Sequence, residues 1–338
     1  MERIQTVRLF FIALPVIGLL GCGTKQRELV TIYVSEDRVF SEPILKDFEK
    51  DTGIRVRAVY DTEEAKSTGI MNRLLAEKGS PQADVYWANE PVRADVLRQQ
   101  GISAAFNPQN AEGIADSFKD PQGFWTGFSA RARLFVMNKK AKYKPTSVVS
   151  YSDPKARGRG VIANPLFGTT AAQMAALFSL WGDEKARQFL AAMKSNQVKL
   201  STGNGESAEF VASGEFDFAL VDSDDAVNRI RQGKPIEIVY PDQGEGDVGL
   251  LLIPNAVTLI RNGPNPEGGR KLIEYLLSKD TERKLAIADC AQIPLHPGVT
   301  PPAELKPISQ LKVMKVNYAE LGAKLQAIQP TLKAWAGY

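Results

Sequence analysis

Cysteine and histidine are the scarcest reactive residues of this 338-residue chain, which has two cysteines and one histidine. Cys22 and Cys290 alone cannot build a zinc site from several thiolates. If Cys22 is modified at the N-terminus, as argued below, Cys290 has no partner and the mature chain has no disulfide. His296 lies in a proline-rich connector, which favours a structural role over catalysis or metal binding. Ser-His and Cys-His catalysis are therefore poorly supported.

Motifs of common enzymes and of nucleic-acid-binding proteins are also missing. The chain has no Gly-x-Ser-x-Gly elbow, no His-Glu-x-x-His helix, no Walker loop and no Rossmann glycine fingerprint at the start of a helix. Its formal net charge is +3, and acidic and basic residues alternate without a block rich in lysine and arginine. Nucleic acid is not an expected partner, because phosphate binding needs clustered cations. We expect a protein that is not an enzyme.

One long apolar run stands at the N-terminus. Two arginines precede Leu9–Leu20, which is too short to span a bilayer, since a spanning helix needs about 20 apolar residues. A basic start, an apolar stretch and small residues predict a secretory signal peptide over residues 1–21. The segment Leu19-Leu20-Gly21-Cys22 resembles the lipobox of bacterial lipoproteins, which implies lipidation of Cys22. We expect export to the periplasm or cell surface, a lipid anchor in the membrane, and a linker over residues 22–28.

Short apolar segments alternate with amphipathic segments along the rest of the chain. A first block predicts strands at Leu29–Val34, Ile54–Tyr60 and Ala83–Trp87, with helices at Ser41–Thr52 and Ala65–Lys78 between them. A second block predicts strands at 160–163, 198–201 and 216–221, each followed by a helix, at 169–181, 206–213 and 225–232. Further helices are expected at 267–277, 281–289 and 308–335. This rhythm is typical of parallel sheets covered by helices.

Two longer segments of strand character, Trp125–Asn138 and Gly249–Ile260, flank the second block. We interpret them as strands that cross between two lobes. The predicted fold class is α/β, with two α/β lobes joined by two crossover strands and a ligand cleft between them. Residues 29–130 and 251–305 are assigned to lobe 1, and residues 131–250 and 306–338 to lobe 2.

Five segments carry a resemblance to a known family. They are VTIYVSEDR, ADVYWANEP, WTGFSARAR, ANPLFGTTAAQ and GEFDFALVDSDDA, in that order. Their order and spacing resemble those of family 1 extracellular solute-binding proteins, and most closely the ferric-iron-binding proteins of bacterial ABC importers. The resemblance implies a periplasmic-binding-protein fold, a monomer, and partnership with a membrane permease and its ATPase.

The resemblance also implies positions for the ligand. An acid or histidine after the family's first strand falls on Asp37, and an acid after a later strand falls on Asn89, with Glu90 next to it. The family's tyrosine pair falls on Asp224 and Asp225. An arginine that meets the anion in some members falls on Arg131. This chain departs from the family at the tyrosine pair, which puts selectivity for Fe³⁺ in doubt.

Carboxylates are hard oxygen donors, suited to Fe³⁺, Mn²⁺, Ca²⁺ or Mg²⁺. The predicted metal ligands are Asp37, Glu90, Asp224 and Asp225, with Asn89 as a carbonyl donor. An acidic cleft equally suits the ammonium group of a polyamine or an aminoalkyl phosphonate, with Trp87 or Trp125 as a cation-π face. The bland alternative for Asp224 and Asp225 is that they only cap a helix and complement its dipole.

An anion is expected beside the cation. Thr169 and Thr170 follow Gly168 at the start of a predicted helix, whose N–H groups can bind an anion together with Arg131. The alternative is that Thr169 caps its own helix and Arg131 pairs with a surface acid. We therefore expect a lipid-anchored binding component of an ABC importer that closes on Fe³⁺, or another hard cation, with a synergistic anion. A binder of a small organic ligand is the main alternative; a ligand-presenting sensor and a secreted hydrolase are weaker ones.

Overall fold

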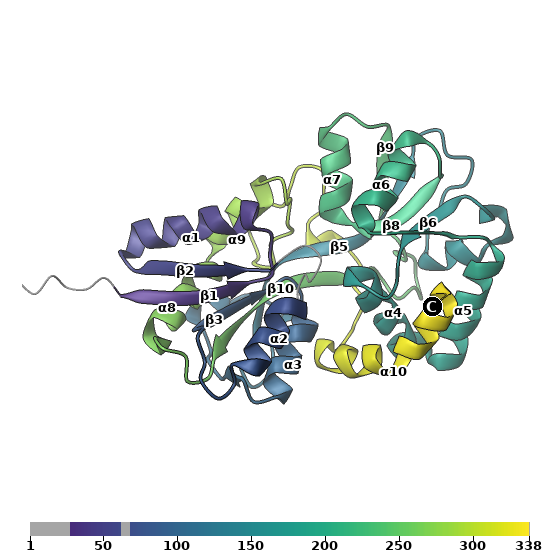
Figure 1. The fold of residues 1–338 in the computed structure, drawn as a ribbon. Helices are drawn as coiled ribbons and strands as arrows, with labels where there is room; N and C mark the ends of the chain where they lie inside the picture. The colour runs from purple at the N-terminus through teal and green to yellow at the C-terminus, as the bar shows by residue number, and fades with distance from the viewer. Residues whose placement is uncertain (1–27, 62–67, 338) are drawn as a thin grey trace, which may run out of the picture.

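The computed structural model describes residues 28–61 and 68–337, which form two α/β lobes sharing one sheet (Figure 1). The strand order is β2-β1-β3-β10-β5-β8-β6-β7, with β4 paired to β10 and β9 to β5. The predicted signal peptide and Cys22 lie outside the described residues. Among the described residues, no helix has both the length and the apolar character needed to cross a membrane.

Lobe 1 is built on three parallel strands, β1 (Leu29–Val34), β2 (Arg55–Tyr60) and β3 (Val85–Ala88). The antiparallel strand β10 (Leu252–Ile260) pairs with β3 and with the short β4 (Ser103–Ala104). Figure 1 shows α1 on one side of this sheet and α2 and α3 on the other. The helices of the lobe are α1 (Arg38–Thr52), α2 (Thr68–Ala76), α3 (Pro91–Gln99), α8 (Pro266–Leu276) and α9 (Lys279–Ile287).

Lobe 2 repeats the pattern around β6 (Gly160–Ala163), which pairs in parallel with β7 (Lys199–Ser201) and β8 (Phe218–Asp222). The strand β9 (Ile236–Val239) runs antiparallel to β5. Four helices complete the lobe: α4 (Gly168–Trp181), α5 (Asp183–Ser195), α6 (Asn204–Ser213) and α7 (Ser223–Arg231). Each parallel strand therefore ends where a helix begins, which brings helix N-termini to one edge of the sheet.

The strand β5 (Thr126–Asn138) joins the two lobes. It pairs with β10 of lobe 1 up to Ala132 and with β8 of lobe 2 from Arg133 onward. The strand therefore crosses between lobes, as the sequence predicted, and its partner changes close to the predicted boundary at residues 130 and 131. The helix α10 (Tyr318–Ala336) packs against both α3 and α4, so the C-terminal segment contacts both lobes. The exact lobe boundaries stay a prediction.

Several predicted element limits are wrong. The helix expected from Ser41 begins at Arg38, so Ser41 lies inside α1 and its hydroxyl donates to the carbonyl of Asp37. The helix expected from Asp225 begins at Ser223. Residues 308–335 do not form one helix. A 3₁₀ turn at Ile308–Gln310 is followed by an irregular segment and then by α10. The helices α3 and α5 were not anticipated.

A buried carboxylate fixes the middle of β5. Glu282 of α9 has no solvent exposure and accepts hydrogen bonds from the backbone N–H groups of Ser129 (2.7 Å), Leu295 (2.9 Å) and His296 (2.9 Å). His296 Nδ1 lies 2.8 Å from Glu282, and its Nε2 lies 2.8 Å from the carbonyl oxygen of Asn110. Ser129 has a positive φ of 40° and is the extra residue of a bulge in β5, opposite Pro254 and Asn255 of β10. Glu282 thus holds a strained turn of the crossover strand against the C-terminal connector.

Replacement of Glu282 should destabilise the fold strongly. Glu282→Gln keeps the shape but puts an N–H₂ group against donors, so we expect a loss of about 2–4 kcal/mol in the free energy of unfolding. Chemical denaturation monitored by circular dichroism measures this loss. The exposed Asp280→Asn on the same helix is the control, and it should change stability by less than about 1 kcal/mol. Equal effects of the two substitutions would contradict the role given to Glu282.

Candidate functional site

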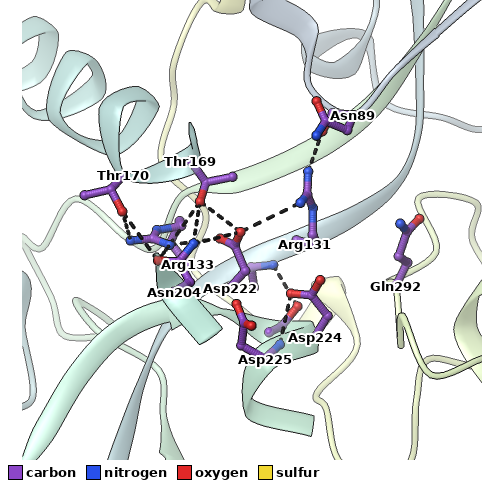
Figure 2. A network of polar contacts seen from close by, with 12 residues as sticks. Asn89, Arg131, Arg133, Thr169, Thr170, Asn204, Asp222, Asp224, Asp225 and Gln292 are labelled. Carbon is purple, nitrogen blue, oxygen red and sulfur yellow. Dashed lines mark hydrogen bonds and ion pairs between the residues drawn. The ribbon is translucent and has the colours of Figure 1, made fainter. Parts of the chain in front are cut away.

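Three acids gather where β8 ends and α7 begins. Asp222, Asp224 and Asp225 each offer one carboxylate oxygen, and these oxygens lie within 4.8 Å of one another. The start of α7 is tied to the crossover strand, because the backbone N–H of Ala132 donates to the hydroxyl of Ser223 at 3.1 Å. Figure 2 shows the three acids directly beside Arg131 and Arg133 of β5. The cluster therefore lies at the junction of the two lobes.

Arg133 organises one half of this junction. Its guanidinium is fully buried and donates to Asp222 (2.9 Å), Asn204 (3.0 Å) and the carbonyl of Leu220 (3.2 Å). It also donates to the hydroxyls of Thr169 (3.2 Å) and Thr170 (3.1 Å). The charge of Asp222 is thus balanced inside the protein. Asp222 holds the site together, and its exposure is only 4%.

The hydroxyls of Thr169 and Thr170 are used within the same network. Thr169 donates to Asp222 at 2.8 Å, and the two hydroxyls face Arg133. The structure therefore places both residues at the junction as predicted, but it commits their side chains to other protein groups. The two residues can still offer an anion the backbone N–H groups at the start of α4. Phe167, the residue before this helix, makes no side-chain capping hydrogen bond to those groups.

Arg131 faces the cluster from the part of β5 that pairs with β10 of lobe 1. Its Nη1 lies 3.8 Å from Asp222, and its Nη2 donates to the backbone oxygen of Asn89. Burial opposes the charge of Arg131, but Asp222, Asp224 and Glu36 outweigh it and raise the pKa of the guanidinium above its ordinary value. Asp225 adds to the same effect. Arg131 is thus a permanent cation among four acids, one of which, Glu36, comes from lobe 1.

Asp224 and Asp225 carry charge less readily than free aspartates. Burial raises the pKa of Asp224 to about 6, although Arg131 opposes the shift. Burial, and then the charge of Asp224, raise the pKa of Asp225 well above its ordinary value. A cation placed between the two carboxylates would favour their ionised forms. The pair is therefore suited to binding positive charge.

The predicted site residues divide into two groups. Arg131, Asp224 and Asp225 come together, and Asn89 joins them through its backbone oxygen. Glu90 instead caps α3, where it accepts from the N–H groups of Val92 (2.7 Å) and Arg93 (3.2 Å) and pairs with the Arg93 guanidinium at 2.9 Å.

Among the described residues, neither Asp37 nor Glu90 belongs to the carboxylate cluster. The expected metal set therefore needs correction, with Asp222 next to Asp224 and Asp225 in this structure. Glu36, and not Asp37, is the acid after β1 whose charge acts on Arg131. The sequence carried a signal for this difference. In an extended segment neighbouring residues point to opposite faces, so Glu36 and Asp37 are not expected to face the cluster together.

The expected cation-π role of the tryptophans is also corrected. Trp87 is fully buried, donates to Asn255 at 3.2 Å and packs against Phe128. Trp125 is 3% exposed and packs edge-on against Tyr318. Neither ring is open to a ligand. Arg133 was missed as well, although its two-residue spacing from Arg131 on a strand puts both side chains on one face.

A charged junction between two α/β lobes is the architecture of a solute-binding protein. Residues 44–326 match the family described as bacterial extracellular solute-binding protein, and the chain belongs to that family. It is 27% identical to iron uptake protein A1 of Synechocystis over 83% of this chain and 81% of that protein. It is 25% identical to a putative 2-aminoethylphosphonate-binding periplasmic protein of Salmonella typhimurium, over 95% of this chain and 91% of that protein. Iron-bound HitA from Pseudomonas aeruginosa superposes with a TM-score of 0.79, over 92% of this chain and all of that one, at 23% identity.

The raised pKa of Asp224 predicts a stability change with a defined sign. Because the folded pKa lies above the ordinary value of 3.8, the native state loses stability as pH rises from about 4 to 6. Asp224→Asn should therefore stabilise the ligand-free protein by about 1 kcal/mol above pH 6, and the gain should vanish near pH 4. Urea unfolding across this pH range is the measurement. The exposed Asp183→Asn serves as control, and a destabilised Asp224→Asn at pH 7.5 would contradict the electrostatic description.

Proposed function

We propose that this protein captures a cationic solute, with Fe³⁺ or another hard metal ion as the first candidate, for an ABC importer. The observation that supports this proposal is an excess of carboxylates over arginines at the lobe junction. The carboxylates of Asp222, Asp224 and Asp225 face two guanidinium groups, those of Arg131 and Arg133. A bound cation would balance this excess. Carboxylate oxygens are suitable ligands for such an ion.

The relatives support a metal cargo. One is named an iron uptake protein, and a major ferric iron-binding protein of Neisseria meningitidis is 23% identical over 88% of this chain. Aspartates stand where the resemblance predicts a tyrosine pair, so the ion-binding oxygens here are carboxylates. Carboxylates bind Fe³⁺ and also softer competitors such as Mn²⁺, so we expect selectivity for Fe³⁺ to be weaker than with phenolates.

An aminoalkyl phosphonate is the second candidate. The observation that favours it is the position of Arg131, a permanent cation whose charge lies next to two carboxylates. A zwitterion could place its amine at Asp224 and Asp225 and its phosphonate at Arg131. The Salmonella relative that matches most of this chain carries 2-aminoethylphosphonate in its name.

Binding would act through closure of the lobes. Glu36 and Asn89 belong to lobe 1, whereas Asp224 and Asp225 belong to lobe 2, so a ligand that contacts both sets stabilises the closed state. The closed protein would then deliver its ligand to a permease powered by a separate ATPase. Lipid at Cys22 would keep the protein at the membrane, and no chemical reaction on the ligand is needed.

Loss of the two carboxylates should abolish cation binding. The protein purified without chelator should carry a stoichiometric metal in elemental analysis, or a small organic mass in native mass spectrometry. Asp224→Ala with Asp225→Ala should lose that ligand, with at least a hundredfold weaker binding by calorimetry. Asp183→Ala, which removes an exposed acid outside the cluster, is the matched control. Retention of the ligand by the double variant would refute the carboxylate site.

The anchor is tested separately. Cys22→Ala should move the protein from the membrane fraction to the soluble fraction after cell lysis, because several acyl chains are needed for a lasting anchor. Metabolic labelling with a radioactive fatty acid should mark the wild type and leave the variant unlabelled. Labelling of both proteins would exclude Cys22 as the modified residue.

A further inference from the structure

Gln292 lies beside the carboxylate cluster, and the sequence had not indicated it as a site residue. Ala130 of β5 and Ile293 of the C-terminal connector exchange two backbone hydrogen bonds of 2.7 Å each, as in an antiparallel sheet. In that register Arg131 is opposite Gln292, and opposite residues direct their side chains to the same face. Figure 2 shows the amide of Gln292 across from Arg131 and Asp224. The side chain is 1% exposed.

A chain of hydrogen bonds fixes which end of the Gln292 amide faces the cluster. The indole N–H of Trp87 can only donate, and it donates to Asn255 Oδ1 at 3.2 Å. Asn255 therefore presents Nδ2 to its other partners, the carbonyl of Ser129 and Gln292 Oε1, both at 2.7 Å. The carbonyl end of Gln292 is consequently occupied. Its N–H₂ end must point away from Asn255.

Buried donors remain unused in this network, and Arg133 Nε is one of them. Among the described residues, nothing accepts a hydrogen bond from Gln292 Nε2 or from Arg131 Nε. A buried donor without a partner is costly, so such groups beside the carboxylate cluster point to an acceptor that a ligand would supply. An N–H₂ group cannot coordinate a metal ion. These donors therefore call for an oxygen atom and are unsuited to the cation itself.

The connector that carries Gln292 also lies close to the acids. Cys290, two residues earlier, is buried, and its pKa is raised by burial and then by the charges of Glu36 and Asp224. Donors for an oxyanion and carboxylates for a cation therefore lie at the same lobe junction.

We propose that Gln292 is a specificity-determining ligand contact, which donates together with Arg131 Nε to an oxyanion bound next to the cation at Asp224 and Asp225. The inference rests on the proposed function and adds one residue to it: the anion is what the family resemblance already implies, and the contact that Gln292 makes with it is new. The oxyanion is either a separate ion beside a metal or the anionic group of an organic amine. A bare cation would leave both donors unsatisfied.

The test measures how much an oxyanion strengthens binding. Wild-type protein is titrated with 2-aminoethylphosphonate and with n-propylamine, and with Fe³⁺ from a nitrilotriacetate donor in the presence and absence of inorganic phosphate. We expect at least a tenfold advantage for the oxyanion in one of the two pairs. The pair that shows the advantage identifies the source of the oxyanion, attached or free.

Gln292→Glu keeps an oxygen for Asn255 but replaces the free donor by a carboxylate oxygen, so the oxyanion advantage should disappear. Gln292→Met removes the donor without adding charge and should reduce the advantage at least fivefold, which covers the case of a poorly folded glutamate variant. The exposed Gln188→Glu on α5 controls for net charge and should keep the wild-type ratio. An unchanged ratio in both Gln292 variants, or wild-type binding of a cation with no oxyanion advantage, overturns the role of Gln292. Binding of none of the probes overturns the proposed function itself.

Discussion

The buried pairing of Arg133 with Asp222 is the constraint on which the lobe junction depends. A guanidinium without solvent exposure needs a counter-charge and hydrogen-bond partners, because an unpaired buried charge is very costly. Both Nη atoms of Arg133 have such partners, whereas its Nε has no acceptor among the described residues. Those partners come from the end of β8, the start of α4 and, through Asn204, the start of α6. One side chain of the crossover strand thus draws three elements of lobe 2 together. Because Asp222 directly precedes α7, the same pairing determines where Asp224 and Asp225 lie.

The proposed ligand site and the stability of the fold make opposing demands. A ligand-free protein gains nothing from burying Asp224 next to Asp222, and the pKa of Asp224, raised to about 6 first by burial and then by the charge of Asp222, reflects that conflict. The unused donors of Gln292 and Arg131 add a second unfavourable element. Under the proposed function, a ligand that supplies positive charge and an acceptor oxygen would make both features favourable. Sites selected for binding commonly show such local cost, which neighbouring structure such as the Arg133 pairing offsets.

Much of the fold was predictable because its signals are local. Apolar alternation and helical spacing revealed the βα rhythm, and the length of the segment around Arg131 revealed a strand that crosses between lobes. The site was only partly predictable, because its composition depends on contacts between distant segments. Glu90 is two residues before Val92, whose N–H it caps, and that local use removes it from the cluster. Glu36 differs from Asp37 by one position, yet one position reverses the face of an extended chain. The burial of Trp87 and the contact of Gln292 with Asn255 arise from segments far apart in sequence.

The resemblance implies a tyrosine pair where this chain has Asp224 and Asp225, and that difference would change which ligands the site accepts. A phenol with an ordinary pKa near 10 becomes a good anion at neutral pH only when a strongly acidic metal ion displaces its proton. A carboxylate whose pKa is about 6 is largely ionised at neutral pH before any ligand arrives. The proposed site would therefore accept an ammonium group or a divalent metal, whereas a phenolate pair would demand Fe³⁺. On the opposite side, Arg131 and Gln292 offer N–H donors from β5 and the connector. A ligand with separated charges would bridge the α7 carboxylates and these donors, and that bridge gives a physical reason for the lobes to close on it.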